Sequence, residues 1–298
     1  MNMSTSRKRA VSEWVQQFVF VGPATFFFAL IVVIPFLLSF YYGFTSWDGV
    51  TSAVKWVGLE NYKYIIMEDE GFRASFWFTA KFMIVAVVLT NTVGFLLALL
   101  LTQPMKMRNL LRTVFFMPNV IGGLLLGFIW LFIFVKGFAA IGDMTNIPFF
   151  QLPWLGTAST AFWGIVIVSV WQFAGYLMII YIAAMLNVPS DVIEAAKIDG
   201  ANRLQTLWNV IVPLIMPAIT VCLFLTISWF FKVFDLNLSL TKGGPFSSTE
   251  SVALNIYYEA FRNNRLGLGT AKALLFFIIV ALITMFQVYF TKKREVEA

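Results

Sequence analysis

The 298-residue chain contains no histidine and a single cysteine, Cys222, and only 12% of its residues are charged. Without histidine, imidazole is excluded as a zinc or haem ligand and as a catalytic base, so a Ser–His–Asp triad cannot be built. One cysteine cannot form an internal disulfide, and redox chemistry is not expected. No glycine is followed by lysine, so a G-x-x-x-x-G-K-[ST] phosphate-binding loop is absent. These absences argue against an enzyme and against ATP binding of that kind.

The charged residues that are present do not form a catalytic or nucleic-acid site. Glu68, Asp69 and Glu70 are adjacent, but they fall in a polar segment with no apolar surroundings to desolvate them. A solvated loop is therefore the better interpretation than an acid–base pair. The basic residues at 7–9 precede the first apolar run, and those at 292–294 follow the last one, which is typical of membrane-flanking anchors. An intramembrane enzyme lacks a nucleophile–base pair here, and no nucleic-acid partner is expected.

Hydrophobic residues make up 60% of the chain, and the mean hydropathy is +0.83. This is far above the apolar share of a soluble domain and indicates an integral membrane protein. Runs of about 20 apolar residues locate transmembrane helices. We expect an all-α protein with one transmembrane domain over residues 1–298 and six spans, at 18–44, 76–101, 114–135, 161–186, 211–234 and 268–290.

Charge placement predicts the orientation of these spans. A basic turn with Lys106, Arg108 and Arg112 follows the second span, and such turns are concentrated on the cytoplasmic side. Six spans put both termini on that same side, where the basic terminal residues agree with it. The first apolar run has no small-residue cleavage site after it and is interpreted as a retained span. We expect a multi-pass protein of the bacterial cell membrane with both termini in the cytoplasm.

The stretch from Val188 to Pro217 is a polar passage between two apolar segments, on the predicted cytoplasmic side. Ser190 is a suitable N-cap for a helix that starts near Asp191. Gly200 is placed to end that helix in a left-handed conformation, and Asn202 can cap a second one. The sequence thus predicts two short helices with a bend between them. A docking element for a soluble partner and a plain connector both explain this stretch at this point.

Polar residues within the spans cost free energy unless they are paired or line a cavity. For Asn91 and Asn119, an interhelical hydrogen bond is the more favoured interpretation, with pore lining as the alternative. Gln172 is a further candidate, and Lys232 and Asp235 are spaced for a local ion pair at the end of the fifth span. Five aromatic residues lie near polar neighbours and could stack on a sugar, although composition alone favours core packing for each of them: Trp171, Phe173, Tyr176, Trp229 and Phe230.

The polar passage carries a recognisable motif. Glu194-Ala195-Ala196, Asp199-Gly200-Ala201 and Ile211-Val212-Pro213 resemble the EAA signature of permease subunits in bacterial ABC importers. Segments such as Val57–Tyr62 and Thr241–Pro245 are similar to the carbohydrate-uptake branch of that family, which includes the maltose-type and glycerol-phosphate permeases. The resemblance covers nearly the whole chain, except between Lys136 and Trp154. It implies the type I importer permease (MetI-like) fold.

The resemblance also implies roles that composition does not show. A cytoplasmic coupling loop at 188–210 would dock on a separate ATPase subunit, through Glu194, Ala195, Ala196, Asp199, Gly200 and Ala201. Contacts to a sugar or oligosaccharide, carried over by position, would come from Phe173, Tyr176, Trp229 and Phe230. The implied partners are a second homologous permease, two ATPase copies, an extracytoplasmic solute-binding protein and membrane lipid. This chain would bind no cofactor, because ATP and Mg²⁺ are used by the ATPase.

Two alternatives to a sugar importer stand beside this hypothesis. An ion-gradient-driven secondary carrier would explain six spans but not the polar passage, and it would prefer ionisable groups in mid-membrane. An importer of the same class could instead move a glycerol-phosphate-like solute.

Overall fold

The structure is a computed structural model that describes residues 18–52 and 54–292. Within this range the chain is helical, with one isolated antiparallel bridge between Thr45 and Trp56, which confirms the predicted all-α class. The basic groups predicted as anchors at residues 7–9 and 293–294, and the side chain of Lys292, lie outside the description. The chain divides into two compact units. Unit 1 comprises residues 18–68 and 258–275 of the described chain, and unit 2 comprises residues 69–257 and 276–292.

Unit 1 begins with an apolar helix over Phe18–Tyr42, whose middle turn η1 (Ala29–Val33) is π-helical and whose last part is α2 (Ile34–Tyr42). The unit also contains α3 (Glu60–Met67), the π-helical turn η4 (Tyr258–Arg262) and the start of α16 (Leu266–Lys292). The amide of Asn61 donates to the carbonyl groups of Gly43 and Thr45, at 3.0 and 2.9 Å. These bonds hold the segment that follows the first span against α3.

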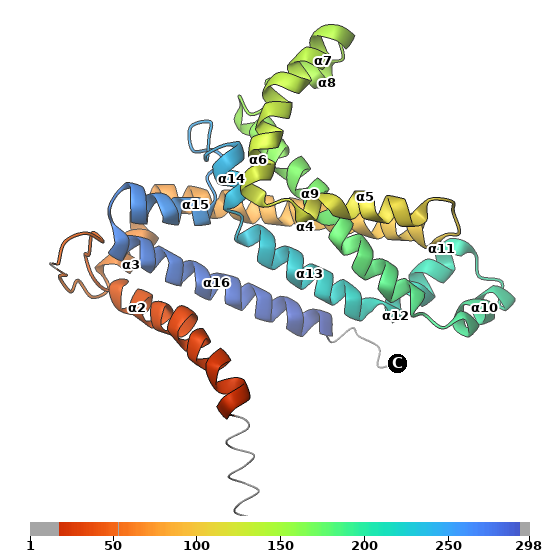
Figure 1. The fold of residues 1–298 in the computed structure, drawn as a ribbon, viewed down its shortest axis with the longest axis horizontal. Coiled ribbons are helices and arrows are strands. Elements are labelled where there is room, and N and C mark those ends of the chain that lie inside the picture. Colours follow the sequence, from red (N-terminus) through yellow and green to blue (C-terminus); the bar gives the residue numbers. More distant parts are fainter. Residues whose placement is uncertain (1–17, 53, 293–298) are drawn as a thin grey trace, which may run out of the picture. The chain divides into compact units, whose positions relative to one another are not determined.

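Unit 2 consists of long helices joined by short ones (Figure 1). In chain order they are α4 (Glu70–Thr102), α5 (Arg108–Val120), α6 (Gly123–Phe132), η2 (Ile133–Gly137), α7 (Phe138–Thr145), α8 (Pro148–Gln151), α9 (Ala158–Leu186), α10 (Ser190–Ile198), α11 (Arg203–Thr206), η3 (Leu207–Ile211), α12 (Val212–Leu214), α13 (Met216–Phe231), α14 (Asp235–Leu240) and α15 (Val252–Tyr257). The part of α16 from Phe276 onward also belongs to this unit.

The core of unit 2 is built around α9, which packs against α4, α5 and α13. A side chain at Gly175 would overlap the backbone carbonyl of Phe115, so glycine is what allows α5 and α9 to approach so closely. One apolar cluster is centred on fully buried residues such as Phe82 and Ile165, and a second one on Leu177 and Met178. Because α9 takes part in both clusters, its position fixes the walls of the site described below.

Five described helices are long and apolar enough to cross a membrane: Phe18–Tyr42, Glu70–Thr102, Gly123–Thr145, Ala158–Leu186 and Leu266–Thr291. A sixth is obtained if Arg203–Leu214 and Met216–Phe231, which are bent by 72° relative to each other, count as one span. This agrees with the predicted all-helical membrane fold. The cytoplasmic position of the termini and the single-domain assignment stay predictions.

The third predicted span differs in detail from the helices observed. The helix expected over residues 114–135 is interrupted between Val120 and Gly123, directly after Pro118 in the last turn of α5. Proline lacks the N–H for the helical ladder, and the glycine pair after it favours a break. Beyond residue 135 the chain stays helical to Thr145, where we expected an outer loop. Lys136 alone does not stop a helix, and the helix ends only at Asn146, which has a φ of 52°.

Candidate functional site

The first part of the site is the coupling element, defined as residues 188–210. Its helix α10 starts at Ser190, with Pro189 in the N-cap position and no side-chain cap, so the prediction of Ser190 as the cap is wrong by one residue. The helix ends as predicted, because Gly200 has a φ of 82°. The N–H of Ala201 then donates to the carbonyl of Ala196 at 2.9 Å, which closes the helix end.

The second short helix, α11, confirms its predicted cap. The Oδ1 atom of Asn202 accepts from the backbone N–H of Gln205 at 2.9 Å, and the Oε1 atom of Gln205 accepts from the N–H of Asn202 at 2.8 Å. This reciprocal capping box fixes the direction in which the chain leaves the bend at Gly200. The helix continues through η3 and α12, then turns sharply into α13.

The predicted coupling residues lie on the surface of this element. Glu194, Ala195, Asp199 and Gly200 are exposed, and Ala196 and Ala201 are half-buried. Several large apolar side chains of this element are also exposed, and the two most exposed are Ile198 at 85% and Leu204 at 68%. Sequence reasoning did not single these two out, although isolated apolar residues in a polar stretch were the available signal. Exposed apolar groups beside small residues and charges are typical of a protein-binding surface.

The second part of the site is the central cavity, a volume of about 270 Å³ within unit 2. It is bounded by the start of α6, the middle of α9, the end of α13 and the start of α14. Its lining residues are Gly123, Ser169, Gln172, Phe173, Trp229, Phe230, Lys232, Val233, Phe234, Asp235 and Leu236.

Three of the four predicted substrate residues line this cavity. The rings of Phe173 and Trp229 are stacked, with centroids 4.8 Å apart. Phe230 is only 1% exposed and packs edge-on against Phe173. Its side chain therefore belongs both to the cavity wall and to the apolar core. Tyr176 does not line the cavity, but its ring packs edge-on against that of Trp229, with the ring centroids 5.4 Å apart. The four residues are therefore brought together as one aromatic group.

Polar groups share the cavity with these rings. The hydroxyl of Ser169 is buried and has no hydrogen-bond partner among the described residues. The amide of Gln172 donates through Nε2 to the carbonyl of Ile121 at 3.2 Å. Lys232 and Asp235 both line the cavity, but within the described chain no ion pair joins them, so that prediction is wrong.

A cavity with aromatic walls, an unengaged hydroxyl, an amide and two charges suits a ligand that is both polar and partly apolar. The sequence analysis named all of these polar groups except Ser169. The only sequence feature that could have indicated Ser169 is that it is a small polar residue within an apolar span.

The two asparagines behave differently from each other. Asn91 donates to Thr226 Oγ1 at 3.0 Å and accepts from the Tyr181 hydroxyl at 2.7 Å, which joins α4 to α13 and α9 and confirms the predicted interhelical bond. Asn119 makes no such side-chain bond within the described chain, so the same prediction is wrong for it.

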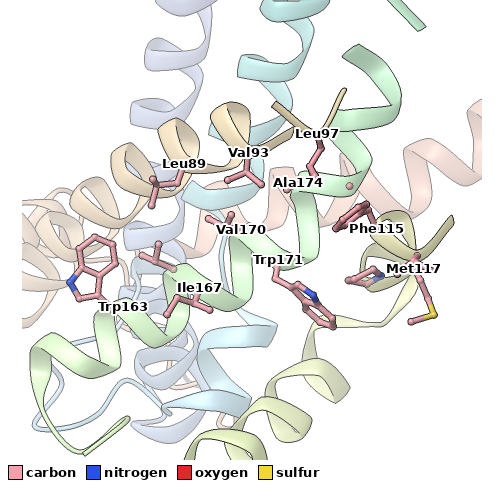
Figure 2. Close-up of a pocket in the computed structure, with 14 residues that line it drawn as sticks. Leu89, Val93, Leu97, Phe115, Met117, Trp163, Ile167, Val170, Trp171 and Ala174 are labelled. Carbon is pink, nitrogen blue, oxygen red and sulfur yellow. The ribbon is translucent and has the colours of Figure 1, made fainter. Parts of the chain in front are cut away.

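A larger side pocket of about 540 Å³ lies on the surface formed by α4, α5 and α9 (Figure 2). It is lined by apolar residues, including Leu89, Phe115, Met117 and Trp163, and no charged residue takes part. Trp171, which the sequence placed among the sugar-stacking candidates, points into this pocket and not into the central cavity. An apolar surface of this kind has no groups to orient a sugar, so the smaller central cavity is the better candidate.

The cavity and the coupling element are linked through α9 and α13. α9 carries Phe173 in its middle and ends at Leu186, just before the coupling element. After that element, η3 and α12 lead through the 72° bend into α13, which starts at Met216 and ends at the cavity (Figure 1). The 16 residues of α13 correspond to about 24 Å of helix. Both helices that follow or precede the coupling element therefore contribute residues to the cavity. Among the described residues there is no group of three or more His, Cys, Asp or Glu side chains that could hold a metal ion.

Comparisons with known proteins agree with this arrangement. The family model described as "Binding-protein-dependent transport system inner membrane component" matches residues 90–296. "Probable starch degradation products transport system permease protein AmyD" of Thermoanaerobacterium thermosulfurigenes is 49% identical over 279 residues, which cover 94% of this chain and 94% of that protein. "Multiple sugar-binding transport system permease protein MsmF" of Streptococcus mutans is 34% identical over 262 residues, with 88% and 90% covered.

Solved structures support the fold independently. A bacterial ABC transporter involved in the import of the acidic polysaccharide alginate matches with a TM-score of 0.80, covering 96% of this chain and 99% of that one at 16% sequence identity. At this identity the match shows the fold alone. The predicted resemblance to ABC importer permeases is confirmed by the family match, and a transport component agrees with the expectation of a non-enzyme. The chain is a multi-pass membrane protein and belongs to the binding-protein-dependent transport system inner membrane component family.

Proposed function

We propose that this chain is the permease subunit of an ATP-driven importer and forms half of the translocation pathway for a sugar or oligosaccharide. The observation that carries the proposal is the link between the coupling element and the central cavity through α9, which ends just before the element, and through α13, which follows it after α12 and a 72° bend. The relatives named for starch degradation products and for multiple sugars support the substrate class.

In the proposed mechanism, α10 and the bend at Gly200 dock on a separate ATPase subunit. Exposed Glu194 and Asp199 give the surface charge, and Ile198 supplies an apolar contact. ATP and Mg²⁺ are bound by the ATPase, two copies of which act with this chain and a second, homologous permease. Closure of the ATPases moves the coupling element, and α9 and α13 carry that movement to the cavity.

The cavity would receive sugar from an extracytoplasmic solute-binding protein. The stacked rings of Phe173 and Trp229 offer a flat surface for the C–H face of a pyranose ring. Ser169 and Gln172 supply hydrogen bonds to hydroxyl groups, and Phe230 limits the depth of the cavity. A volume of about 270 Å³ in this one chain suits one sugar unit at a time, and the partner permease would complete the pathway.

The test is ATP-dependent uptake by the assembled importer in proteoliposomes, with labelled maltodextrins and an unrelated disaccharide as probes. Glu194→Lys reverses a charge on the exposed face of α10 and is expected to lower uptake at least about tenfold, because like charges or an unpaired charge at a protein contact weaken docking. Glu68→Lys makes the same charge change at an exposed residue of unit 1 and serves as the matched control.

Normal uptake by Glu194→Lys would contradict the coupling role. Uptake by this chain alone, driven by an ion gradient without ATP, would instead support a secondary carrier. Uptake of sn-glycerol 3-phosphate with no sugar transport would place the chain in the same importer class with a different solute.

A further inference from the structure

Unit 1 contains a pocket of about 300 Å³ that has no part in the proposed pathway. It is called the outer pocket here, and its lining residues are Ser46, Trp47, Asn61, Tyr64, Asn264, Arg265 and Leu268. They come from the segment after the first span, from α3 and from the residues at the start of α16. Three segments that are distant in the sequence thus build one concave surface.

Several hydrogen-bonding groups of the outer pocket are unengaged. Within the described chain, the side chains of Ser46, Tyr64 and Asn264 make no hydrogen bond, and Asn61 uses only its amide N–H groups. The same lining includes Leu268, whose apolar side chain is buried. A small concave site that combines unengaged polar groups with an apolar side chain is typical of a ligand site.

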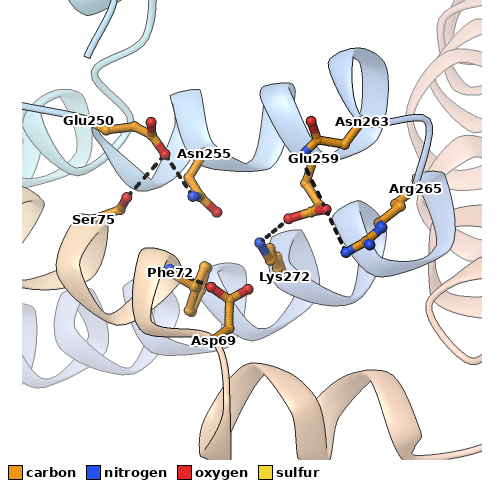
Figure 3. Close-up of polar contacts among 9 residues, drawn as sticks. All are labelled: Asp69, Phe72, Ser75, Glu250, Asn255, Glu259, Asn263, Arg265 and Lys272. Atoms are coloured by element: carbon orange, nitrogen blue, oxygen red, sulfur yellow. Dashed lines mark hydrogen bonds and ion pairs between the residues drawn. The ribbon is translucent and has the colours of Figure 1, made fainter. Parts of the chain in front are cut away.

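The charge of the outer pocket is positive. The carboxylate of Glu259 is held by the buried Lys272, with 2.6 Å between Nζ and Oε2, whereas Nη1 of Arg265 lies 3.6 Å from Oε1 (Figure 3). Glu259 is therefore paired with two cations, and the longer of the two contacts is the one to Arg265. The Arg265 side chain is 60% exposed, and no acidic residue lines the pocket. A planar guanidinium in this setting favours a phosphate or a carboxylate.

The aromatic wall of the pocket is held in place before any ligand arrives. The ring of Trp47 stacks on Tyr42 with centroids 4.3 Å apart, and its Nε1 donates to the carbonyl of Thr51 at 2.7 Å. The turn that carries Thr51 is closed by Asp48, whose carboxylate accepts from the N–H groups of Val50 and Thr51; these bonds hold the pKa of Asp48 below its ordinary value. A preformed wall lowers the entropy cost of binding.

The outer pocket lies at the ends of two apolar helices. The first span ends at Tyr42, four residues before Ser46, and α16 begins at Leu266, directly after Arg265. In a membrane these ends lie near the headgroup layer, where tryptophan and tyrosine are enriched. No residue in the apolar window of the first span is buried, so the span offers a surface for acyl chains.

We propose that the outer pocket binds the headgroup phosphate of an anionic phospholipid. Arg265 pairs with the phosphate, Tyr64 and Asn264 donate to its oxygens, and the acyl chains lie along the first span. A soluble phosphate ester offers the same phosphate chemistry, but it lacks the chains that the exposed span would hold. The extracytoplasmic binding protein could use the same arginine, and this is an outcome that the test separates.

The test uses the assembled importer complex, stripped of lipid in detergent, with lipid binding followed by native mass spectrometry. Short-chain phosphatidylglycerol is the main probe, and sn-glycerol 3-phosphate is the soluble one. Arg265→Gln is expected to weaken phosphatidylglycerol binding at least about tenfold, which is the loss of one charge-assisted pair. Asn264→Gly removes an exposed side chain that makes no hydrogen bond within the described chain, and glycine keeps the left-handed conformation of this position, where φ is 54°; it is expected to weaken binding about threefold.

Arg262→Gln is the matched control, because Arg262 is an exposed arginine of unit 1 that stacks on Tyr258 and does not line the pocket. Its lipid binding should equal that of the unaltered complex.

Equal losses of lipid binding in Arg262→Gln and Arg265→Gln would overturn the proposal, because binding would then depend on the overall positive charge of unit 1 and not on the pocket. Unchanged lipid binding in Arg265→Gln, together with weaker stimulation by the binding protein, would assign the pocket to that protein instead. Binding of sn-glycerol 3-phosphate that is as tight as that of the lipid would remove the membrane as the source of the phosphate.

Discussion

The coupling element and the central cavity are joined by the same two helices, yet they are built in opposite ways. The coupling element has short helices, a left-handed glycine and apolar side chains that are exposed, such as Ile198. The cavity has long helices, stacked rings and a buried hydroxyl that has no hydrogen-bond partner in the part of the chain that the structure describes. The first arrangement suits a large, complementary partner, whereas the second suits a small ligand. Variants at the two ends should therefore fail in different steps of transport.

The largest effect is expected at the bend of the coupling element. Gly200 has a φ of 82°, where a β-branched residue is strained, so Gly200→Val should redirect α11 and lower ATP-dependent uptake by about 100-fold. Apart from its chain neighbours, no atom of the described residues lies within 4 Å of a Cβ atom added there, so the expected effect comes from the backbone conformation. Uptake by the reconstituted importer measures it.

Gly200→Asn is the control for this prediction, because asparagine tolerates the left-handed conformation. It should keep most of the uptake. Equal loss in both variants would show that the added side chain obstructs docking, and equal retention in both would show that the bend has no part in coupling.

A smaller and different effect is expected in the cavity. Trp229→Ala removes the ring that stacks on Phe173, and it should lower the apparent affinity for the transported sugar about tenfold, since an aromatic contact of this kind contributes about 1.4 kcal/mol. Assembly with the ATPase should be unchanged. The concentration dependence of uptake and co-purification of the ATPase together measure the two effects.

Trp171→Ala is the matched control, because Trp171 comes from the same stretch of α9 as Phe173 but lines the side pocket. Its uptake kinetics should resemble those of the unaltered importer. If Trp171→Ala and not Trp229→Ala weakened sugar uptake, the side pocket would replace the central cavity as the substrate site.

The sequence predicted the parts of this arrangement that follow from local chemistry. Apolar runs of about 20 residues indicated a six-span fold, and Gly200 and Asn202 indicated the bend, because caps and left-handed turns depend on neighbouring residues. The cavity depended on contacts between distant segments. The resemblance to known permeases brought Phe173 and Trp229 together, but periodicity could not separate them from Trp171, which faces another surface of α9. The break after Pro118 was equally hidden, because proline is tolerated inside many membrane helices.

The smallest effect, and the sharpest test of the cavity, is expected from Ser169→Ala. The hydroxyl of Ser169 lines the cavity, is buried and has no partner in the described chain. An unsatisfied buried polar group costs about 1 kcal/mol or more, so alanine should raise the thermal stability of the assembled complex slightly. If the hydroxyl bonds to sugar during transport, the same variant should lower the apparent sugar affinity about threefold.

Ser239→Ala is the control, because Ser239 is equally buried but donates to the carbonyl of Asp235 at 2.7 Å and does not line the cavity. A gain in stability together with unchanged affinity would make Ser169 a packing residue and move the sugar contacts towards the other polar groups of the cavity, Gln172, Lys232 and Asp235.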